Sequence, residues 1–392
     1  MTHTLDSYGG TNQLKGKSTG WFHLEELGGR RWFITPEGNA FFPVSLAHIY
    51  TGNSQPTVQK LHDGDKEAWI EKWFGQMRGL GFNCALAGVT SQCRDPQGYV
   101  EVEKVEALFR RESFPYTVGL FLIPHPNELP KGQERPDIFT PAYQDWVEEL
   151  VADVCSRYTD DPMMMGYYYG FGTFIRPQSW IDSIPSLDSE APEQENIRNM
   201  AVHLYRMVHD AIGRHDPNHL ILGPYVKEQS FDIETWKALT PYVDMLSPQH
   251  FNRDSSFAEQ SAATGRAVLV SDEESGHIFA AARQNPRSVT SENKGRVYSL
   301  LLDRHLRDAN VCGVNFCATL YDLDDGPLMD KMGMMEGLYD WDGNAKPGLA
   351  DVVREANKEF YERATQPYGS DRLSELDATL CRARDEVHKH VR

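Results

Sequence analysis

Residues 266–274 read Arg-Ala-Val-Leu-Val-Ser-Asp-Glu-Glu, and this stretch does most to decide the fold. Four apolar residues run through one serine into three consecutive acids, Asp272, Glu273 and Glu274. A short unbroken apolar run is typical of a β-strand that is buried on both faces. In α/β proteins, binding and catalytic side chains gather at the carboxyl end of such a strand. The same residues also fit a strand whose solvated acids cap the next helix, so the rest of the chain must decide.

Further apolar stretches recur along the chain, and helical periodicity fills the intervals between them. Trp69, Trp73 and Met77 behind Asp65 predict a capped helix, and Thr140-Pro141 predicts the start of another. Strands are predicted at 40–46, 83–89, 116–123, 163–169, 220–226, 243–247, 267–270 and 311–320. Eight strands that alternate with helices over roughly 320 residues are typical of a (β/α)8 barrel.

The main rival fold is an open doubly wound sheet. Its nucleotide-binding versions need a G-x-G-x-x-G or G-x-x-x-x-G-K-[ST] loop after a strand, and neither occurs at a strand-to-helix turn here. We therefore expect an α/β protein in which 21–365 form a (β/α)8 TIM barrel that begins with a β-hairpin around Gly28-Gly29. Residues 1–20 are expected to form an N-terminal extension. Residues 366–392 are expected to form a helical tail that packs on the barrel or mediates self-association as a homo-oligomer.

Composition narrows the range of partners. The chain has 392 residues, with 39 Lys and Arg against 57 Asp and Glu, a formal charge of −18. Such an acidic surface repels phosphate backbones and anionic lipid, so neither nucleic acid nor a membrane is expected as a partner. No cofactor motif is found, and the six cysteines lack metal-ligand spacing. Residues 1–20 lack the apolar core of a signal peptide, which predicts a cytoplasmic protein unless a leader has been removed.

The barrel prediction places the functional side chains at the carboxyl ends of the strands. Those positions are rich in acids, imidazoles, amides and aromatic rings: His48, His125, Tyr169, Gly172, Tyr225, Glu228, Gln249, His250, Asp272, Glu273, Tyr321 and Asp322. Glycoside hydrolysis needs two carboxyls and many hydroxyl contacts, which this set could supply. The positions lack a basic cluster for phosphate and a GxSxG elbow for acyl transfer.

A divalent metal is the main competing use of these side chains. His48, His125 and His250 could bind zinc or manganese together with Asp272, because three imidazoles and a carboxylate suit either ion. No H-x-H or H-x-x-x-H spacing occurs at these positions. We therefore expect each histidine to be a hydrogen-bonded pocket residue and the site to hold no metal.

Two segments carry a resemblance to a known family. Residues 32–42, Trp-Phe-Ile-Thr-Pro-Glu-Gly-Asn-Ala-Phe-Phe, are followed by Ser45-Leu46-Ala47-His48. Farther on, residues 139–143 lead through Asp160-Asp161-Pro162 to Met165-Gly166-Tyr167-Tyr168. These segments resemble the opening and the fourth strand of the β-agarase-like glycoside hydrolases of the retaining (β/α)8 clan. The resemblance extends from about Gly20 to Tyr361 and implies a barrel that cleaves galactan- or agarose-like β-linked chains.

The chain departs from that family where its chemistry is most diagnostic. The family carries an Asn-Glu pair after the fourth strand, with the Glu as general acid/base, and Phe171 and Gly172 stand there instead. The family's nucleophilic Glu matches Asp272, whose shorter side chain shifts the attacking oxygen, and a misplacement of about 1 Å can cost about 100-fold in rate. Adjacent acids point to opposite faces of a strand, so Asp272 and Glu273 are not both expected to reach a substrate. Reach favours Glu273, but the alignment favours Asp272, which is preferred.

Alternative functions stay open. A divergent retaining hydrolase would take its proton from Glu228, His250 or Asp322, and is preferred because so many titratable groups are present. The chain could instead lack an acid/base, or bind sugar without cleaving it. A metal-dependent lyase or isomerase on a sugar is the further alternative. For the hydrolase, the sugar subsites would be formed by His48, His125, Tyr169, Gly172, Tyr225, Gln249, Tyr321 and Trp341.

Overall fold

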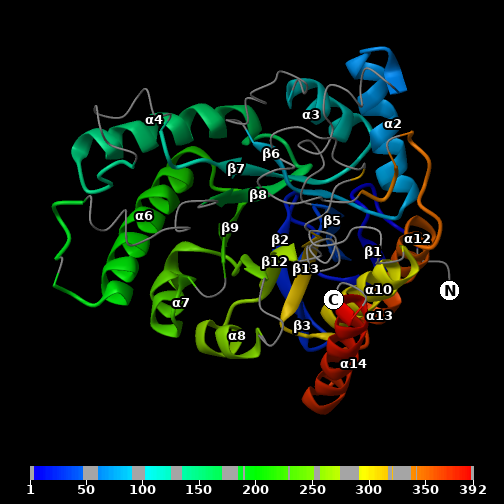
Figure 1. The fold of residues 1–392 in the computed structure, drawn as a ribbon. Coiled ribbons are helices and arrows are strands. Elements are labelled where there is room, and N and C mark those ends of the chain that lie inside the picture. Colours follow the sequence, from blue (N-terminus) through cyan, green and yellow to red (C-terminus); the bar gives the residue numbers. More distant parts are fainter. Residues whose placement is uncertain are drawn as a thin grey trace.

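The computed structural model describes residues 4–46, 61–90, 102–124, 135–169, 184–188, 190–227, 230–250, 257–273, 291–316, 320, 337–340 and 342–389. Within these residues the chain is a mixed α/β protein with one antiparallel sheet, two parallel sheets and helices around them (Figure 1). No helix in the described part of the chain is long and apolar enough to cross a membrane.

The N-terminal strands form an antiparallel sheet in the order β1-β4-β3-β2. Its members are β1 (Thr11–Lys15), β2 (His23–Leu27), β3 (Arg30–Ile34) and β4 (Asn39–Phe41). The predicted hairpin is confirmed, because β2 pairs with β3 around Gly28 and Gly29, whose φ angles are 63° and 79°. Positive φ at both central residues suits a tight hairpin turn and favours glycine. Strand β1, which was not predicted, pairs with β4.

The remaining strands form two parallel sheets. One has the order β6-β7-β8-β9, and the other has the order β10-β11-β12-β13-β5. The first contains β6 (Ala85–Thr90), β7 (Tyr116–Leu120), β8 (Met164–Tyr169) and β9 (Leu220–Pro224). The second contains β10 (Val226–Lys227), β11 (Pro248–His250), β12 (Val268–Glu273), β13 (Val311–Phe316) and β5 (Val44–Leu46).

The two parallel sheets adjoin at both edges. At one edge only Tyr225 separates β9 from β10, and the amide of Asp244 donates to the carbonyl of Ile221 at 2.8 Å. At the other edge the side chain of Asn83 accepts from the amide of Val44 at 2.8 Å. The ladders of the described residues nevertheless form two sheets, so the closed ring of eight strands stays a prediction.

The inner faces of the parallel sheets meet across one apolar cluster. Leu86, Tyr168 and Leu222 from the first sheet share this cluster with Leu269 from the second. Phe22, Phe33 and Phe41 of the N-terminal sheet belong to it as well. The antiparallel sheet therefore covers one end of the space between the parallel sheets. This arrangement leaves the carboxyl ends of the parallel strands for a site.

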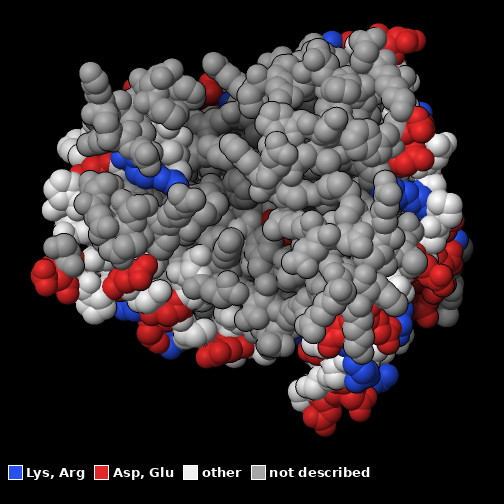
Figure 2. Space-filling view, in the orientation of Figure 1, with Lys and Arg blue, Asp and Glu red and all other residues white. Residues whose placement is uncertain are grey.

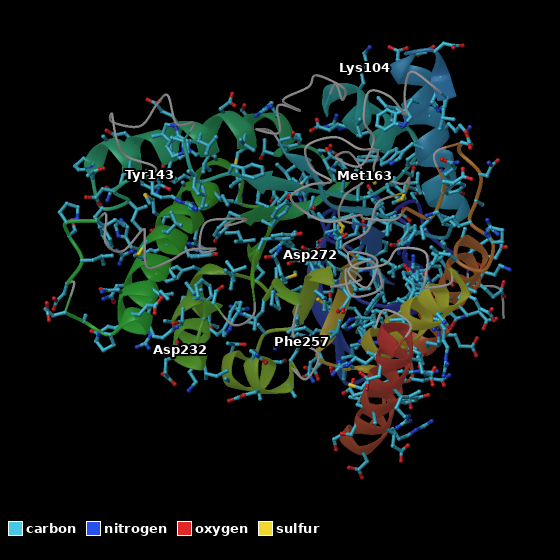
Figure 3. All side chains as sticks on the ribbon, in the orientation of Figure 1. Lys104, Tyr143, Met163, Asp232, Phe257 and Asp272 are labelled. Carbon is cyan, nitrogen blue, oxygen red and sulfur yellow. The ribbon has the colours of Figure 1, made fainter. Side chains whose placement is uncertain are left out.

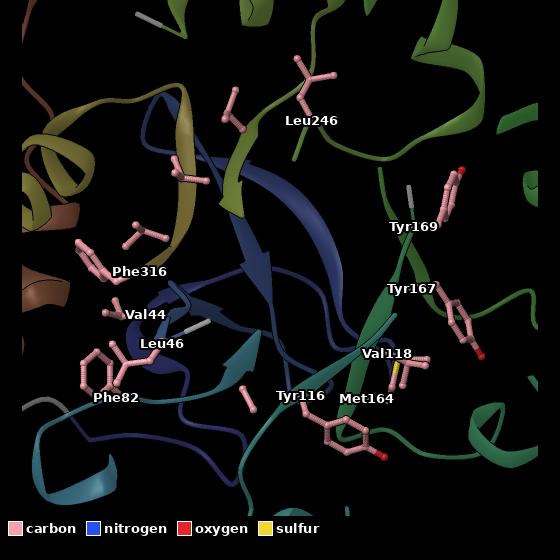
Figure 4. Close-up of a cluster of buried hydrophobic side chains, with 14 of the residues drawn as sticks. Val44, Leu46, Phe82, Tyr116, Val118, Met164, Tyr167, Tyr169, Leu246 and Phe316 are labelled. Atoms are coloured by element: carbon pink, nitrogen blue, oxygen red, sulfur yellow. The ribbon is translucent and has the colours of Figure 1, made fainter. Parts of the chain in front are cut away.

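Helices surround the parallel sheets, and the last of them packs on another helix. They are α2 (Lys66–Gly79), α3 (Val102–Arg111), α4 (Pro141–Tyr158), α6 (Glu193–His215), α7 (Ile233–Leu239), η3 (Thr240–Tyr242), α8 (Ala258–Thr264), α10 (Ser291–Arg307), α12 (Ala350–Lys358), α13 (Phe360–Ala364) and α14 (Ser370–Lys389). Figure 4 shows Val44, Tyr169 and Phe316 pointing outward from the strands, and these residues share a buried cluster with the apolar sides of the helices. The helix starts predicted at Asp65 and Thr140 are confirmed as N-caps of α2 and α4.

Several predicted boundaries differ from the structure. The run 40–46 is not one strand, because it divides at Pro43 into β4 and β5, which belong to different sheets. Proline has no amide hydrogen and cannot continue a ladder, which explains the division. Strand β11 begins after the predicted 243–247, where Leu246 makes an isolated bridge to Val268.

Helix α10 is fixed at its carboxyl end by a buried ion pair. Arg304 Nη1 lies 2.5 Å from Asp308 Oδ2, and Arg304 Nε lies 3.0 Å from Asp377 on α14. Leu380 and Ala383 of α14 are buried in the cluster that also contains the apolar side of α10. Burial raises the pKa of the Asp308 carboxyl, but Arg304 and the amide of Asn310 outweigh it and hold that pKa below its ordinary value.

Asp308→Asn is expected to lower the free energy of unfolding at pH 7 by roughly 3 kcal/mol, because breaking a buried pair leaves Arg304 short of a partner. A lowered carboxyl pKa stabilises the fold above the unfolded-state pKa of about 3.9, and this contribution is lost as the pH falls through the folded-state pKa. The difference between the two proteins should therefore shrink below about pH 4. Urea unfolding at pH 7 and at pH 3 measures it, and an equal difference at both pH values would contradict the assignment.

Candidate functional site

A β-bulge near the end of β12 sets the direction of its acids. Val270 pairs with Val314 and Glu273 pairs with Phe316, so β12 takes three residue steps where β13 takes two. The extra residue lies in Ser271-Asp272, and bulges of this kind bend a strand and re-aim its side chains. Towards β11 the register is regular, with Gln249 opposite Asp272.

Asp272 lies at the centre of the candidate site. Its Oδ2 accepts a hydrogen bond of 2.9 Å from Gln249 Nε2. Asp272 is only 4% exposed and Gln249 only 6%, so the contact is well shielded from water. The amide holds one carboxylate oxygen against the neighbouring strand and thereby fixes the orientation of the group. Figure 3 labels Asp272 in the middle of the molecule, and Figure 2 shows acidic atoms in a hollow of the same central region.

Buried polar side chains next to Asp272 link neighbouring strands. Ser271 Oγ donates to the carbonyl of Ser247 at 2.7 Å, and Ser247 Oγ donates to the carbonyl of Leu222. Asn315 Nδ2 donates to the carbonyl of Ser271 at 2.9 Å. A bulge disrupts the ladder locally and can leave a backbone carbonyl without a ladder partner. The Asn315 side chain donates to the carbonyl of Ser271 in place of such a partner. Asn315 and Ser247 therefore support the backbone that carries Asp272.

A small cavity lies between the two parallel sheets beside these links. Its volume is about 10 Å³, close to the least that a single water needs. Tyr168 and Tyr225 contribute rings whose centroids are 5.4 Å apart. Both tyrosines are almost fully buried. The cavity is lined by Leu86, Thr117, Tyr168, Leu222, Tyr225, Ser247, Leu269, Ser271 and Asn315.

Glu273 has a different hydrogen-bond partner from that of Asp272. Its Oε2 shares a hydrogen bond of 2.6 Å with His305 Nε2, and both side chains are completely buried. His305 belongs to α10, which packs on the outer face of β13, since the ring of Tyr298 on that helix lies 4.5 Å from Phe316. The two adjacent acids therefore contact side chains on different elements, Gln249 on β11 and His305 on α10.

The structure brings together only part of the predicted set. Asp272, Gln249 and Tyr225 lie at the adjoining ends of β9 to β12. Tyr169 is turned towards α6 and lies with its ring 4.8 Å from that of Tyr205, so it is not brought to Asp272. His250 lies in β11 opposite Glu273, and its side chain is outside the description. The other predicted residues lie outside the described part of the chain: His48, His125, Gly172, Glu228, Tyr321, Asp322 and Trp341.

Four residues of the site were not predicted. Tyr168, Ser247, Ser271 and Asn315 are buried polar or aromatic residues inside apolar strands. Successive side chains of a strand point to opposite faces, and counting along each strand could have placed these residues on the inner face. Among the residues that the structure describes, no cluster of three or more His, Cys, Asp or Glu is arranged to hold a metal ion. His48 and His125 lie outside the described residues, as does the side chain of His250, so the metal-site alternative stays a prediction.

Comparisons with known proteins identify the fold. No protein family model matches the sequence, and no curated protein matches it. Among solved structures, the agarase AgWH50C is similar at a TM-score of 0.67 and 14% identity, over 93% of this chain and 67% of that one. An exo-β-agarase is similar at a TM-score of 0.65 and 13% identity, over 93% and 68% of the two chains. GH5_18 from Streptomyces cattleya, in complex with GlcNAc, is similar at 0.55 and 16%, over 83% and 82%. The chain has a glycoside hydrolase fold.

Proposed function

We propose that this chain hydrolyses β-linked, galactan- or agarose-like oligo- or polysaccharides with retention of configuration. The single observation that carries the proposal is the Asp272 carboxylate, oriented by Gln249 at the carboxyl end of a parallel strand. Glycoside hydrolases place their two carboxyls across the scissile bond, and parallel α/β folds place chemistry at this edge. The fold similarity to two agarases supports the substrate class.

The proposal includes the closure of the two parallel sheets into one (β/α)8 barrel. The contacts at Asn83 and at Asp244 support it, because they join the two sheets at both edges. A closed barrel would gather the ends of all eight strands around Asp272. The residues predicted at the other strand ends, His48, His125 and Tyr321 among them, would then line the same hollow.

The proposed reaction follows the double displacement of retaining glycosidases. Asp272 would attack the anomeric carbon and form a glycosyl ester, which water would then hydrolyse. Glu228, His250 or Asp322 would donate the proton to the leaving oxygen and later activate the water. No cofactor is needed for this chemistry.

The test is an assay of the purified full chain on agarose, neoagaro-oligosaccharides, β-1,4-galactan and aryl β-D-galactosides. We expect new reducing ends on at least one galactose-based substrate. Proton NMR at early times should show the β-anomer first, because retention preserves the configuration. An α-anomer at early times would contradict retention.

The second candidate function is a sugar-binding barrel without turnover. The presence of Phe171 and Gly172 where the related family has its Asn-Glu pair favours it, since neither residue can transfer a proton. Loss of general acid catalysis typically costs about 100- to 10,000-fold. Binding of neoagaro-oligosaccharides with no product, even from activated aryl galactosides, would select this function. Turnover that a chelator abolishes would instead select the metal-dependent lyase or isomerase.

A further inference from the structure

Glu273 and His305 form a buried pair that the proposed reaction does not use. Their oxygen and nitrogen are 2.6 Å apart, and neither side chain has any exposed surface. Burying two such polar groups is costly unless each finds a partner, and here they partner each other. The pair lies one residue along the chain from Asp272, at the end of β12.

The geometry of β12 couples the two acids. Consecutive residues of a strand point to opposite faces, so the direction of Glu273 determines the direction of Asp272. The bulge at Ser271-Asp272 loosens this relation on the amino-terminal side, because an extra residue there breaks the regular alternation. Asn315 and Ser247 support the backbone on that side. A firm contact on the carboxyl-terminal side is what completes the support that holds Asp272 towards Gln249.

The partner of Glu273 is itself anchored. The carbonyl of His305 accepts a hydrogen bond of 3.0 Å from Arg30 Nη2 on β3. The His305 ring also lies beside Phe257, with 6.4 Å between the ring centroids. Helix α10 is thus tied to the N-terminal sheet at the residue that holds Glu273, and the pair connects Asp272 to a rigid part of the fold.

We propose that Glu273 and His305 are positioning residues, which hold the end of β12 so that the Asp272 carboxylate faces Gln249 and the substrate. This inference rests on the proposed function in that it takes Asp272 as the nucleophile. It also gives Glu273 a supporting role in place of direct catalysis.

Two variants of His305 separate positioning from packing. His305→Gln keeps an amide donor near the place of Nε2, whereas His305→Leu keeps apolar volume and loses the donor. We expect His305→Leu to lower kcat by about 10- to 100-fold with KM changed less than about threefold, because a misplacement of about 1 Å has this effect. His305→Gln should restore kcat to within about threefold of the natural chain.

Tyr298→Phe is the matched control. It removes another buried hydrogen bond of α10, from Tyr298 to Asn357 at 2.9 Å, which does not lead to β12. Tyr298→Phe should change the unfolding temperature without changing kcat. If it lowers kcat as much as His305→Leu does, the effect is general loosening of α10 and the inference is overturned.

A crystal structure of His305→Leu gives a readout that does not depend on turnover. We expect the Gln249–Asp272 contact, 2.9 Å in the natural chain, to be broken or divided between conformers. An intact contact together with an unchanged kcat would overturn the inference. If the natural chain itself has no turnover, the proposed function fails while the crystal structure still decides the positioning role.

Should His305→Leu not fold, the double variant Glu273→Met/His305→Leu replaces the pair by apolar groups, which folds tolerate. A broken contact in it supports the inference, and an intact one overturns it.

Discussion

Asp272→Asn is expected to abolish hydrolysis while it preserves the fold and the binding of oligosaccharide. An amide cannot act as the nucleophile, and its oxygen can still accept the hydrogen bond from Gln249 Nε2. Removal of a group that takes part in the bond-making step should lower kcat by roughly 1,000-fold or more. Initial rates on the best galactose-based substrate, together with calorimetric titration of a neoagaro-oligosaccharide, measure both effects.

The matched control is Asp153→Asn, which makes the same chemical change on α4. Asp153 is largely exposed and pairs with Arg157 at 3.1 Å, far from the candidate site along the chain. It should keep full activity. Asp272→Ala with added azide gives a second test, because azide can replace a missing nucleophile and leave an α-glycosyl azide. If Asp272→Asn keeps more than about a tenth of the activity, Asp272 is not the nucleophile.

Arg30→Met is expected to cause the largest loss of stability of any single change considered for this chain. The Arg30 guanidinium is buried and donates to the carbonyls of five residues at 2.6–3.1 Å: His305, Leu306, Asp308, Val311 and Ala364. Several of these carbonyls lie at the end of α10, where the helix has no internal partner for them. Burial lowers the pKa of Arg30 to about 10, so the group still carries its charge at pH 7.

We expect Arg30→Met to lower the free energy of unfolding by about 3–5 kcal/mol, because buried carbonyls lose a charged donor together. The apolar stem of methionine would keep part of the packing against Trp32 and Phe42, whose rings lie 5.4 and 5.0 Å from the guanidinium carbon. Guanidinium chloride unfolding measures the change. Arg31→Met is the neighbouring control, since Arg31 contacts only a loop carbonyl, that of Gly265, among the hydrogen bonds described for it. A loss for Arg30→Met no larger than that for Arg31→Met would contradict this account.

Much of the α/β order could be predicted from the sequence, because a strand buried on both faces leaves an apolar run that stands out from helical periodicity. The parallel strands at 116–123, 163–169 and 267–270 were located in this way. The polar strand β1 and the amphipathic helix α3 were missed, the first because Thr11-Asn12-Gln13-Leu14-Lys15 has no apolar run. Pro43 could have indicated that β4 and β5 are separate strands, but the apolar run 40–46 obscured this division.

The site was predictable only as far as single strands allow. Asp272 and Gln249 were placed at strand ends from their own segments, and their contact follows from the parallel register. The support from Asn315 and His305 could not be predicted, because it depends on a bulge and on contacts between segments distant in the sequence. Sequence alternation did indicate that Asp272 and Glu273 would point in different directions, and their partners differ as expected.

Covalent trapping tests the central claim most directly. A 2-deoxy-2-fluoro-β-D-galactoside with a dinitrophenyl leaving group needs no proton donor to form the glycosyl ester, and the fluorine slows its hydrolysis. Peptide mass spectrometry after incubation should find the fluorogalactosyl mass on Asp272, and Asp272→Asn should remain unlabelled. A label on Glu273, Glu228 or any other residue would contradict the account, as would a natural chain that turns over galactosides but is never labelled.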